Sequence, residues 1–291
     1  KPVFLVSNIQ GTSSDNTVME STARGLPILD GVYSFLAGVR CMHRYRDYLK
    51  LENNNPDPVA TQTITKWQQS IEQGQLIGEH EALEILADNG IATNQSYCVD
   101  NLKNALQSAN KLGYPVVLKT AVSGISHKSE VHGVHLNLNS EDELRGAYED
   151  LEKRLGPKVL ISPMIDNEGV EMILGMTTDP QFGPMIALGF GGVYAEVLKD
   201  VVTLMPPFSA ETAEQALSEL KMESLFYGYR GSEAVDVESY CKMASKFSLF
   251  ALAMRNHICE IDINPIILGK DICMGLDALM VIRQDIKYEE D

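Results

Sequence analysis

Apolar and polar positions in the first fifty residues follow the pattern of strands that alternate with helices. Residues 2–9 (PVFLVSNI) form a short apolar run rich in β-branched and aromatic side chains, which predicts a buried strand. A short helix over 17–24, a second strand over 26–29 and a longer helix over 31–49 are predicted next. Such alternation is typical of a parallel sheet. Two strands are too few for a domain, so we expect the end of a larger α/β domain.

A polar run separates this part from the rest of the chain. Residues 51–60 (LENNNPDPVA) hold three asparagines and two prolines, which favour extended, solvated backbone. An ordinary surface loop is the alternative, but the pattern changes on either side of the run. The sequence therefore predicts one domain part at 1–50, a linker at 51–66 and a second domain at 67–291.

The second part combines helices with runs of neighbouring strands. Helical spacing and capping residues predict helices at 79–90, 101–112, 141–155, 210–220 and 237–256. Strands are predicted at 94–100, 115–119, 134–138, 158–164, 170–176, 184–188 and 258–263. We expect the strands at 158–164 and 170–176 to pair like a hairpin. Strands that follow one another beside helical units indicate α+β character.

The stretch 114–134 (YPVVLKTAVSGISHKSEVHGV) holds the first candidate chemistry. Lys119 ends its strand and can meet a phosphate as a point charge, and the Gly/Ser loop after it can turn N–H groups toward anionic oxygens. His127 in that loop can act as a nucleophile or a base. The three together indicate phosphoryl chemistry. Simpler alternatives are a Lys119 that only reaches solvent, a merely exposed His127, and a metal cluster with His132 and His135.

A second candidate site lies near the C-terminus. The sequence EIDINP places Glu260, Asp262 and Asn264 on one face of a strand, because strand side chains alternate with period two. Together with Asp277, these oxygen-bearing side chains suit a hard cation such as Mg²⁺ that keeps several waters. An acidic solvent face is the alternative, but it would not require the Asn-Pro pair or an Asp isolated between apolar neighbours.

Weaker signals lie between these two stretches. Gly191 and Gly192 belong to a GFGG loop that permits close approach of the backbone to a ligand, although a tight turn is the alternative. Glu171 lies in an apolar strand, where it could bond a ribose or orient a lysine, or simply face solvent. Arg230 in GYRG could clamp a phosphate or pair with Asp236.

Composition narrows the classes of function. The chain has 291 residues, a formal net charge of −16 and a pI near 4.8. This argues against sequence-independent nucleic-acid binding, which needs basic surface, but local lysines or a metal can still attract phosphate. The five cysteines form no CxxC pair, which favours free thiols in a reducing compartment, and no apolar run reaches membrane-spanning length. We therefore expect a cytoplasmic protein with no nucleic-acid or membrane partner.

Several of these pieces together resemble a known family. YPVVLK, SHKSEVHGV, DPQFGPMIALGFGGVYAEVLKD, GYRG, EIDINP and LDALMVI occur in the order found in the ATP-grasp portion of NDP-forming acyl-CoA synthetases. This is the family of ADP-forming acetate–CoA ligase, distantly related to the β subunit of succinyl-CoA synthetase. The resemblance covers residues 79–291. Residues 1–50 resemble the end of a flavodoxin-like CoA-ligase domain, so the fold implied is an ATP-grasp fold preceded by the tail of a parallel-sheet domain.

The resemblance implies a nucleotide site for ATP or ADP. In that family pattern, Lys119 would contact the nucleotide phosphates and Glu171 would line the nucleotide cleft. Arg230, Gly191 and Gly192 would complete the nucleotide-binding set.

The resemblance also implies a metal and a phosphate carrier. Asn264 and Asp277 match the Mg²⁺ ligand positions, and Asp262 matches a carboxylate that supports a phosphohistidine. His127 matches the second phospho-accepting histidine of the ADP-forming family. One departure is His132, where the family usually has Gly, and this alters the loop that carries His127.

The activity implied is an acid–thiol ligase reaction that interconverts acid, CoA and ATP with acyl-CoA, ADP and phosphate through a phosphohistidine relay. It would need CoA-binding domains, in the same protein or in a partner subunit, and a small carboxylic acid, in a homo- or hetero-oligomer. One alternative is a non-catalytic ATP-grasp regulatory module of a protein acyltransferase. Another is a carboxylate–amine ligase, which would have no need of His127.

Overall fold

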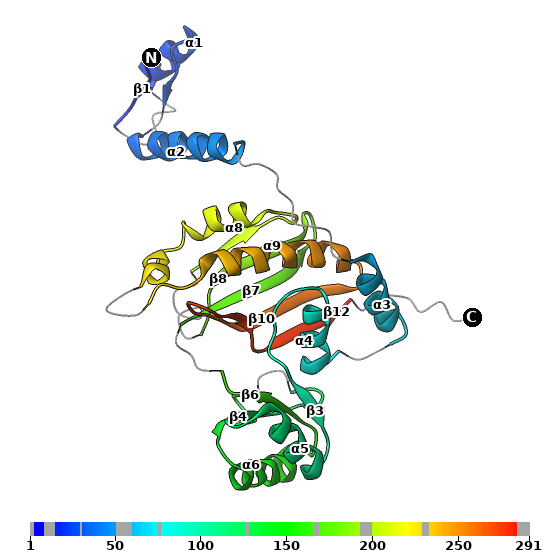
Figure 1. Cartoon of the computed structure of the whole chain (residues 1–291). Helices are drawn as coiled ribbons and strands as arrows, with labels where there is room; N and C mark the ends of the chain where they lie inside the picture. The colour runs from blue at the N-terminus through cyan, green and yellow to red at the C-terminus, as the bar shows by residue number, and fades with distance from the viewer. Residues whose placement is uncertain are drawn as a thin grey trace, which may run out of the picture. The chain divides into compact units, whose positions relative to one another are not determined.

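The computed structural model describes residues 3–8, 15–29, 31–50, 60–74, 77–125, 128–165, 169–192, 200–228 and 233–283. The chain forms two compact units, Lys1–Asn53 and Asn54–Asp291 (Figure 1). No helix in the described ranges combines the length and the apolar character needed to cross a membrane.

The first unit contains a parallel strand pair with two helices. β1 (Leu5–Val6) pairs in parallel with β2 (Ile28–Leu29), as the alternating pattern predicts. α1 (Asn16–Ala23) begins after Asp15, whose carboxylate accepts hydrogen bonds from the first turn, and α2 (Val32–Tyr48) follows β2. Large apolar side chains stay exposed in this unit, among them Val3, Phe4, Leu5, Leu26, Tyr33, Leu36, Met42 and Tyr45.

The second unit is built on an antiparallel sheet. Among the described residues, six strands form it, in the order β11-β10-β7-β8-β9 with β12 also on β10. These strands are β7 (Val170–Asp179), β8 (Gly183–Phe190), β9 (Val201–Leu204), β10 (Ile258–Leu268), β11 (Cys273–Gly275) and β12 (Ala278–Ile282). The accompanying helices are α3 (Thr61–Glu72), α4 (Glu79–Asp88), α8 (Ala210–Leu217), η2 (Glu223–Tyr227) and α9 (Val237–Met254).

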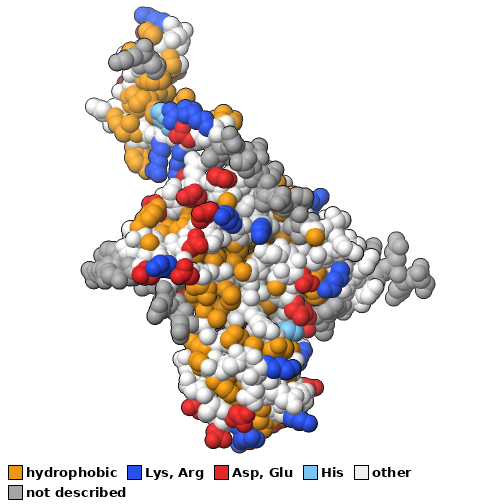
Figure 2. All heavy atoms as spheres, viewed as in Figure 1, with side chains coloured by type: hydrophobic (Ala, Val, Ile, Leu, Met, Phe, Trp, Pro, Cys, Tyr) orange, Lys and Arg blue, Asp and Glu red, His pale blue; other side chains and the backbone are white. Residues whose placement is uncertain are grey.

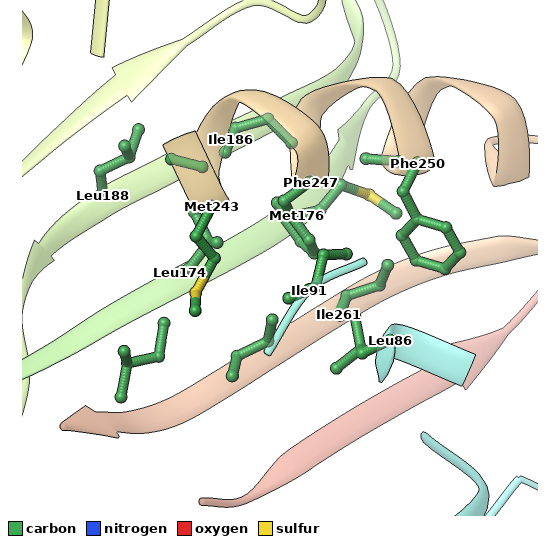
Figure 3. Close-up of a cluster of buried hydrophobic side chains, with 14 of the residues drawn as sticks. Leu86, Ile91, Leu174, Met176, Ile186, Leu188, Met243, Phe247, Phe250 and Ile261 are labelled. Atoms are coloured by element: carbon green, nitrogen blue, oxygen red, sulfur yellow. The ribbon is translucent and has the colours of Figure 1, made fainter. Parts of the chain in front are cut away.

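One face of this sheet packs against helix α9 and forms the main core (Figure 3). Leu174 and Met176 of β7 alternate with side chains that point the other way, and Ile261 of β10 lies on the same buried face. Phe247 and Phe250 of α9 cover them, and burying each such side chain contributes about 2 kcal/mol. The alternation leaves the opposite face of β7 and β10 free to carry polar groups.

A second sheet forms a small subdomain, defined here as residues 97–163, and the rest of the second unit is the large subdomain. Among the described residues it has the order β3-β6-β4-β5. Its strands are β3 (Tyr97–Val99), β4 (Val116–Thr120), β5 (Val134–Leu138) and β6 (Val159–Pro163). Its helices, α5 (Leu102–Leu112) and α6 (Glu141–Arg154), begin at the caps Asn101 and Ser140.

The helices cover one face of the small sheet. Val116 and Leu118 of β4 pack with Ile161 of β6 in a separate core against Leu144 and Tyr148 of α6. Lys119 therefore points to the uncovered face, because its neighbours in the strand point to the helices.

Asn94 joins the two subdomains. Its backbone N–H donates to the carbonyl of Gly275 at 2.8 Å, and its side-chain amide donates to the carbonyl of Pro163 at 3.1 Å. The amide is buried, with 6% of the residue exposed. Asn94, which precedes β3, is thus bonded both to Pro163 at the end of β6 and to Gly275 of β11.

The predicted hairpin of the strands at 158–164 and 170–176 is wrong. β6 pairs with β3 and β4 in the small sheet, whereas β7 pairs with β8 and β10 in the large one. β6 is buried almost throughout, as a central strand should be. Two adjacent apolar runs can belong to different cores, and spacing alone does not reveal this.

Two further elements differ from the pattern. Residues 61–66, predicted within the linker, form the first half of α3, where Ile64, Trp67 and Ile71 bury one stripe of an otherwise polar helix. Strand β10 continues through Asn264 and Pro265, which are joined by a cis peptide bond, instead of ending there. The pairing register shifts at this point, so the Asn-Pro pair interrupts the ladder and not the strand.

Candidate functional site

A cleft of about 760 Å³ opens where the two subdomains meet beside α4. Residues 77–81 and 277–283 line it from the large subdomain. Residues 121–125, Lys128 and Lys158 line it from the small subdomain. On the described part of the visible face, acidic and basic side chains are interspersed and form no continuous basic surface (Figure 2). This distribution favours a local charged site over a nucleic-acid surface.

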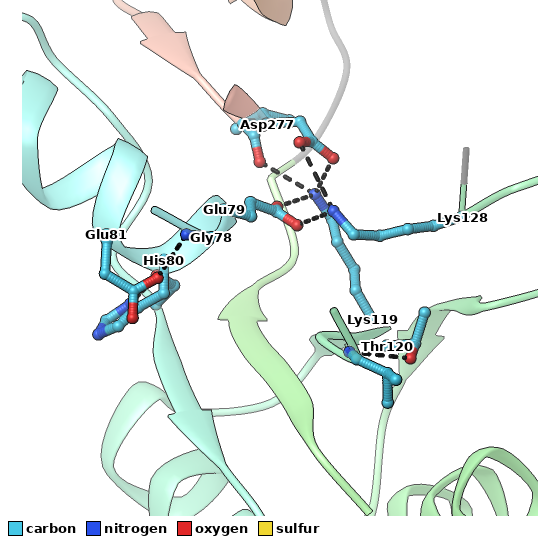
Figure 4. Close-up of polar contacts among 11 residues, drawn as sticks. Gly78, Glu79, His80, Glu81, Lys119, Thr120, Lys128 and Asp277 are labelled. Atoms are coloured by element: carbon cyan, nitrogen blue, oxygen red, sulfur yellow. Dashed lines mark hydrogen bonds and ion pairs between the residues drawn. The ribbon is translucent and has the colours of Figure 1, made fainter. Parts of the chain in front are cut away.

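Lys119 contacts two residues that line this cleft, Glu79 and Asp277 (Figure 4). Its ammonium lies 2.8 Å from Oε1 of Glu79 and 2.9 Å from Oδ2 of Asp277, and it donates to the carbonyl of Leu276 at 3.1 Å. Only 11% of its side chain is exposed. The predicted strand-end lysine therefore does not extend into solvent. It connects the small subdomain to two segments of the large subdomain, through Glu79 and Asp277.

Lys128 reaches the same carboxylates. Its ammonium bonds Oε2 of Glu79 and lies 3.9 Å from Oδ1 of Asp277. Figure 4 shows the two lysine nitrogens side by side between the two acids. Lys128 directly follows His127 in the sequence. The lysine that binds Glu79 is therefore the neighbour of the predicted phosphate carrier.

Glu79 is placed by the start of helix α4. Gly78 precedes it in an extended conformation, and its N–H donates to Oε2 of Glu81 at 3.0 Å, which closes the first turn. A carboxylate in the first turn interacts favourably with the helix dipole. Sequence reasoning missed both Glu79 and Lys128 as site residues. The acidic first turn was visible, but nothing local showed that its partner lies forty residues later, at Lys119.

The paired carboxylates control the charge of Lys119. Burial by itself lowers the pKa of this ammonium, but Glu79 and Asp277 act in the opposite direction and leave the pKa above its usual value. Lys119 is therefore a fixed positive charge at neutral pH. A positive charge that is largely shielded from solvent is suited to binding phosphate oxygens.

The predicted cation site lies on the polar face of the large sheet. Asp262 of β10 is opposite Gly175 of β7, on the face that does not pack against α9. The backbone N–H of Asn264 donates to the carbonyl of Asp277 at 3.2 Å. Burial raises the pKa of Asp262, the charges of Glu260 and Asp277 raise it further, and a hydrogen bond from Asn264 lowers it in part. The structure thus brings together all four residues of this prediction.

Crowded carboxylates of this kind fit a hard cation. The described residues contain no group of three His, Cys, Asp or Glu side chains set to hold a metal on their own. Mg²⁺ needs fewer protein ligands, because it is commonly held by one or two carboxylates together with water and substrate phosphates. The backbone bond between Asn264 and Asp277 places the two predicted ligands next to each other, and the Asp277 carboxylate faces two lysines.

Glu171 and the glycine pair form a second group on the same sheet. Gly191 N–H donates to the carbonyl of Glu171 at 2.7 Å, and Gly192 has a φ of +62°. A Cβ on Gly192 would meet the Glu171 carboxylate, which would have to move, and the positive φ independently favours glycine here. Glu171 lies four residues from Gly175 along β7, about 13 Å at the usual rise of a strand. The group therefore lies some distance from Asp262.

The residues that follow His127 form a closed turn. Gly133 N–H donates to the carbonyl of Lys128 at 2.7 Å, and Arg154 of α6 donates to the carbonyls of Val131 and His132. Asp150 holds the Arg154 guanidinium through both carboxylate oxygens. The turn is thus fixed from the side of α6.

His135 does not approach this turn as a metal ligand. Its Nε2 lies 3.4 Å from Asp150, the partner of Arg154. His127 and Arg230 fall outside the described residues. All five cysteines carry free thiols, and Cys98 contributes to the cleft.

Comparisons with known proteins agree with this architecture. Residues 69–282 match the family described as the ATP-grasp domain. The chain is 34% identical over 215 residues to the β subunit of ADP-forming acetate–CoA ligase II of Pyrococcus furiosus, which covers 70% of this chain and 91% of that subunit. It is 34% identical over 257 residues to a trans-feruloyl-CoA synthase of an unknown prokaryotic organism, covering 84% of this chain. The chain spans only 35% of the length of that synthase.

A solved structure is similar over the same region. It is the dinucleotide-forming acetyl-coenzyme A synthetase 1 of Ca. Korarchaeum cryptofilum, in complex with coenzyme A and Mg-AMPPCP, with its phosphohistidine segment pointing towards the nucleotide-binding site. The TM-score is 0.67 at 33% identity, over 76% of this chain and all of that one. The chain therefore belongs to the ATP-grasp family, in the group that includes the β subunits of ADP-forming acetate–CoA ligases.

Proposed function

We propose that this chain is the nucleotide-binding part of an ADP-forming acyl-CoA synthetase, an acid–thiol ligase. The reaction interconverts acid, CoA and ATP with acyl-CoA, ADP and phosphate, and His127 carries the phosphoryl group to or from ADP. The observation that carries the proposal is that Lys119 and Lys128 both approach Asp277 at one cleft, and that Lys128 directly follows His127 in the sequence. The similarity to acetate–CoA ligase β subunits supports it.

In this proposal the positively charged residues bind phosphate and the oxygen-bearing residues bind the cation. Lys119 and Lys128 neutralise the phosphate oxygens, which is the main protein contribution to phosphoryl transfer. Asp277 and Asn264 hold Mg²⁺, which supplies positive charge to the transferring phosphoryl group when it is bound. Asp262 lies beside them and supports the imidazole of His127 when that side chain enters the site. Two transfers through an imidazole replace one long transfer by two short ones.

The nucleoside lies farther along the same face. Glu171, with Gly191 and Gly192, lines this part of the site, and Arg230 is assigned to it from the sequence pattern alone. The glycine pair permits backbone contact with the ligand, and Glu171 offers a carboxylate to a sugar hydroxyl.

CoA chemistry requires further domains. The feruloyl-CoA synthase is much longer than this chain, whereas the acetate–CoA ligase relative is a separate β subunit. We propose CoA-binding and CoA-ligase domains in the same protein or in a partner subunit, a small carboxylic acid as substrate, and a homo- or hetero-oligomer. Residues 1–50 belong to the CoA-ligase part, the linker that follows ends before helix α3, and the ATP-grasp domain extends from this helix to residue 291. The free thiols favour a reducing, cytoplasmic compartment.

Phosphate labelling tests the relay. The chain, joined with CoA-binding domains of an acetate–CoA ligase, is incubated with γ-labelled ATP and Mg²⁺, and the label is mapped by mass spectrometry without acid. We expect acid-labile label on His127 that is absent from His127→Ala, with Mg-ADP affinity unchanged. His43→Ala, at an exposed position of α2, is the matched control. ATP binding without any label would overturn the relay and favour the regulatory module.

A further inference from the structure

Glu79 is shared between two cations from different segments. Its Oε1 bonds Lys119 at the end of β4, and its Oε2 bonds Lys128 in the loop that follows. Only 5% of the Glu79 side chain is exposed. The proposed function uses both lysines and gives this carboxylate no role.

The charges of the cluster balance only while no ligand is bound. Two ammonium groups face two carboxylates, Glu79 and Asp277, so the local sum is zero. A nucleotide brings several negative charges, and a cation takes up Asp277. The phosphate oxygens then need the same two ammonium groups that Glu79 holds. A carboxylate with one cation on each oxygen occupies the place of a phosphate between two lysines.

We propose that Glu79 is a positioning residue that holds Lys119 and Lys128 together in the place of a nucleotide phosphate and gives them up when the nucleotide binds. This inference rests on the proposed nucleotide site. Glu79 keeps two like charges side by side in a cleft where they would otherwise repel each other. Glu79 also competes with the nucleotide phosphates for the two lysines. Its negative charge therefore weakens the affinity for ADP and favours ADP release.

The competition predicts an unusual sign for a substitution. Glu79→Gln keeps the size and a hydrogen-bond acceptor but removes the negative charge. By isothermal titration calorimetry on the full chain, we expect the Kd for Mg-ADP to fall by roughly threefold to tenfold. The Kd for adenosine, measured by ligand-observed NMR, should stay the same because adenosine has no phosphate. A purely structural role would weaken both ligands.

Glu84→Gln is the matched control. It removes one negative charge from the same helix, but Glu84 faces His80 and does not contact the lysines. We expect unchanged Kd values for both ligands. In a Lys128→Met background, the effect of Glu79→Gln on Mg-ADP should shrink, since one of the two contested ammonium groups is gone.

Zero-length carbodiimide cross-linking tests the exchange in the wild-type protein. A Glu79–Lys128 or Glu79–Lys119 cross-linked peptide should form without ligand and be lost at saturating Mg-ADP. Cross-links that persist at saturation, or a Glu79→Gln variant that binds Mg-ADP no tighter than wild type, would overturn this inference alone. Wild-type protein without measurable affinity for Mg-ADP would overturn the proposed nucleotide site and this inference with it.

Discussion

The guanidinium of Arg154 donates a 2.9 Å hydrogen bond to the backbone carbonyl of His132, a residue whose φ is +50°. A non-glycine residue in this left-handed region is uncommon and costs backbone energy. Arg154 also holds the neighbouring carbonyl of Val131 at 3.0 Å. The turn after His127 is therefore kept in an unfavourable conformation by a side chain of helix α6.

Substituting Arg154 should loosen this turn. Arg154→Lys keeps the charge but loses the planar fork that bonds two carbonyls and Asp150 at once. We expect faster hydrogen exchange of residues 128–133, by about tenfold, and slower appearance of phosphate on His127 in a single turnover. Arg145→Ala, at an exposed position of the same helix, is the control and should change neither. Unchanged exchange in Arg154→Lys would show that the turn holds itself.

Substituting His132 should relieve the backbone. Glycine populates positive φ about as readily as negative φ, so His132→Gly removes the conformational cost of about 1 kcal/mol. We expect a melting temperature equal to or above that of wild type, measured by calorimetry. Ser129→Gly, in the same turn without a positive φ, should lower it, because there only the entropy cost of glycine applies. A clear loss of stability in His132→Gly would mean that the imidazole itself contributes to packing.

Asp262 should show a conflict between stability and function. Its folded pKa lies above the unfolded value, so the folded protein binds this proton more tightly. The contribution of Asp262 to stability therefore falls as pH rises through the folded pKa. We expect Asp262→Asn to raise the melting temperature at pH 7.5, with the gain shrinking as pH is lowered towards 4, the region of the unfolded pKa.

The same variant should lose function. In the proposed relay Asp262 supports the imidazole of His127, so we expect Asp262→Asn to slow phosphate transfer on the order of a hundredfold. Glu260→Gln, at an exposed position on the same strand face, should give a smaller gain in stability and little loss of transfer. If Asp262→Asn lowers stability at neutral pH, the carboxylate has a favourable partner that outweighs its burial.

Gly192 should tolerate no side chain. Gly192→Ala places a Cβ on the Glu171 carboxylate at a φ of +62°, and the two costs add. We expect at least tenfold weaker Mg-ADP binding and a lower melting temperature. Gly183→Ala isolates the backbone cost, because its φ is +77° and its Cβ would meet open space. Stability of Gly192→Ala should recover in part when Glu171 is also changed to Ala.

Local patterns carried most of the elements of the second unit. A continuous apolar run located β4, an alternating run located β5, and Asn101 and Ser140 marked helix starts, because these signals depend on neighbours in sequence. The period also predicted that Asp262 and Asn264 share a face, and the residues that alternate with them, Ile261 and Ile263, are buried. These residues are close in the chain, so spacing alone was enough.

Contacts between segments far apart in the chain could not be predicted from local sequence patterns. The pair Glu79–Lys119 joins the start of a helix to the end of a strand. Nothing in the local sequence of either segment indicates that the other is its partner. β6 and β7 look alike as apolar runs but belong to different cores. Helix α3 was hidden because only three of its residues are buried among polar ones.

The bonds of Asn94 have a geometric consequence for the cleft. Asn94 bonds Gly275 of β11 and Pro163 at the end of β6. Lys119 pairs with Leu160, three residues before Pro163, so about 10 Å of strand separates this lysine from the junction. Gly275 lies only two residues before Asp277. The bonds of one asparagine therefore fix the spacing between the strand end that carries Lys119 and the segment that carries Asp277.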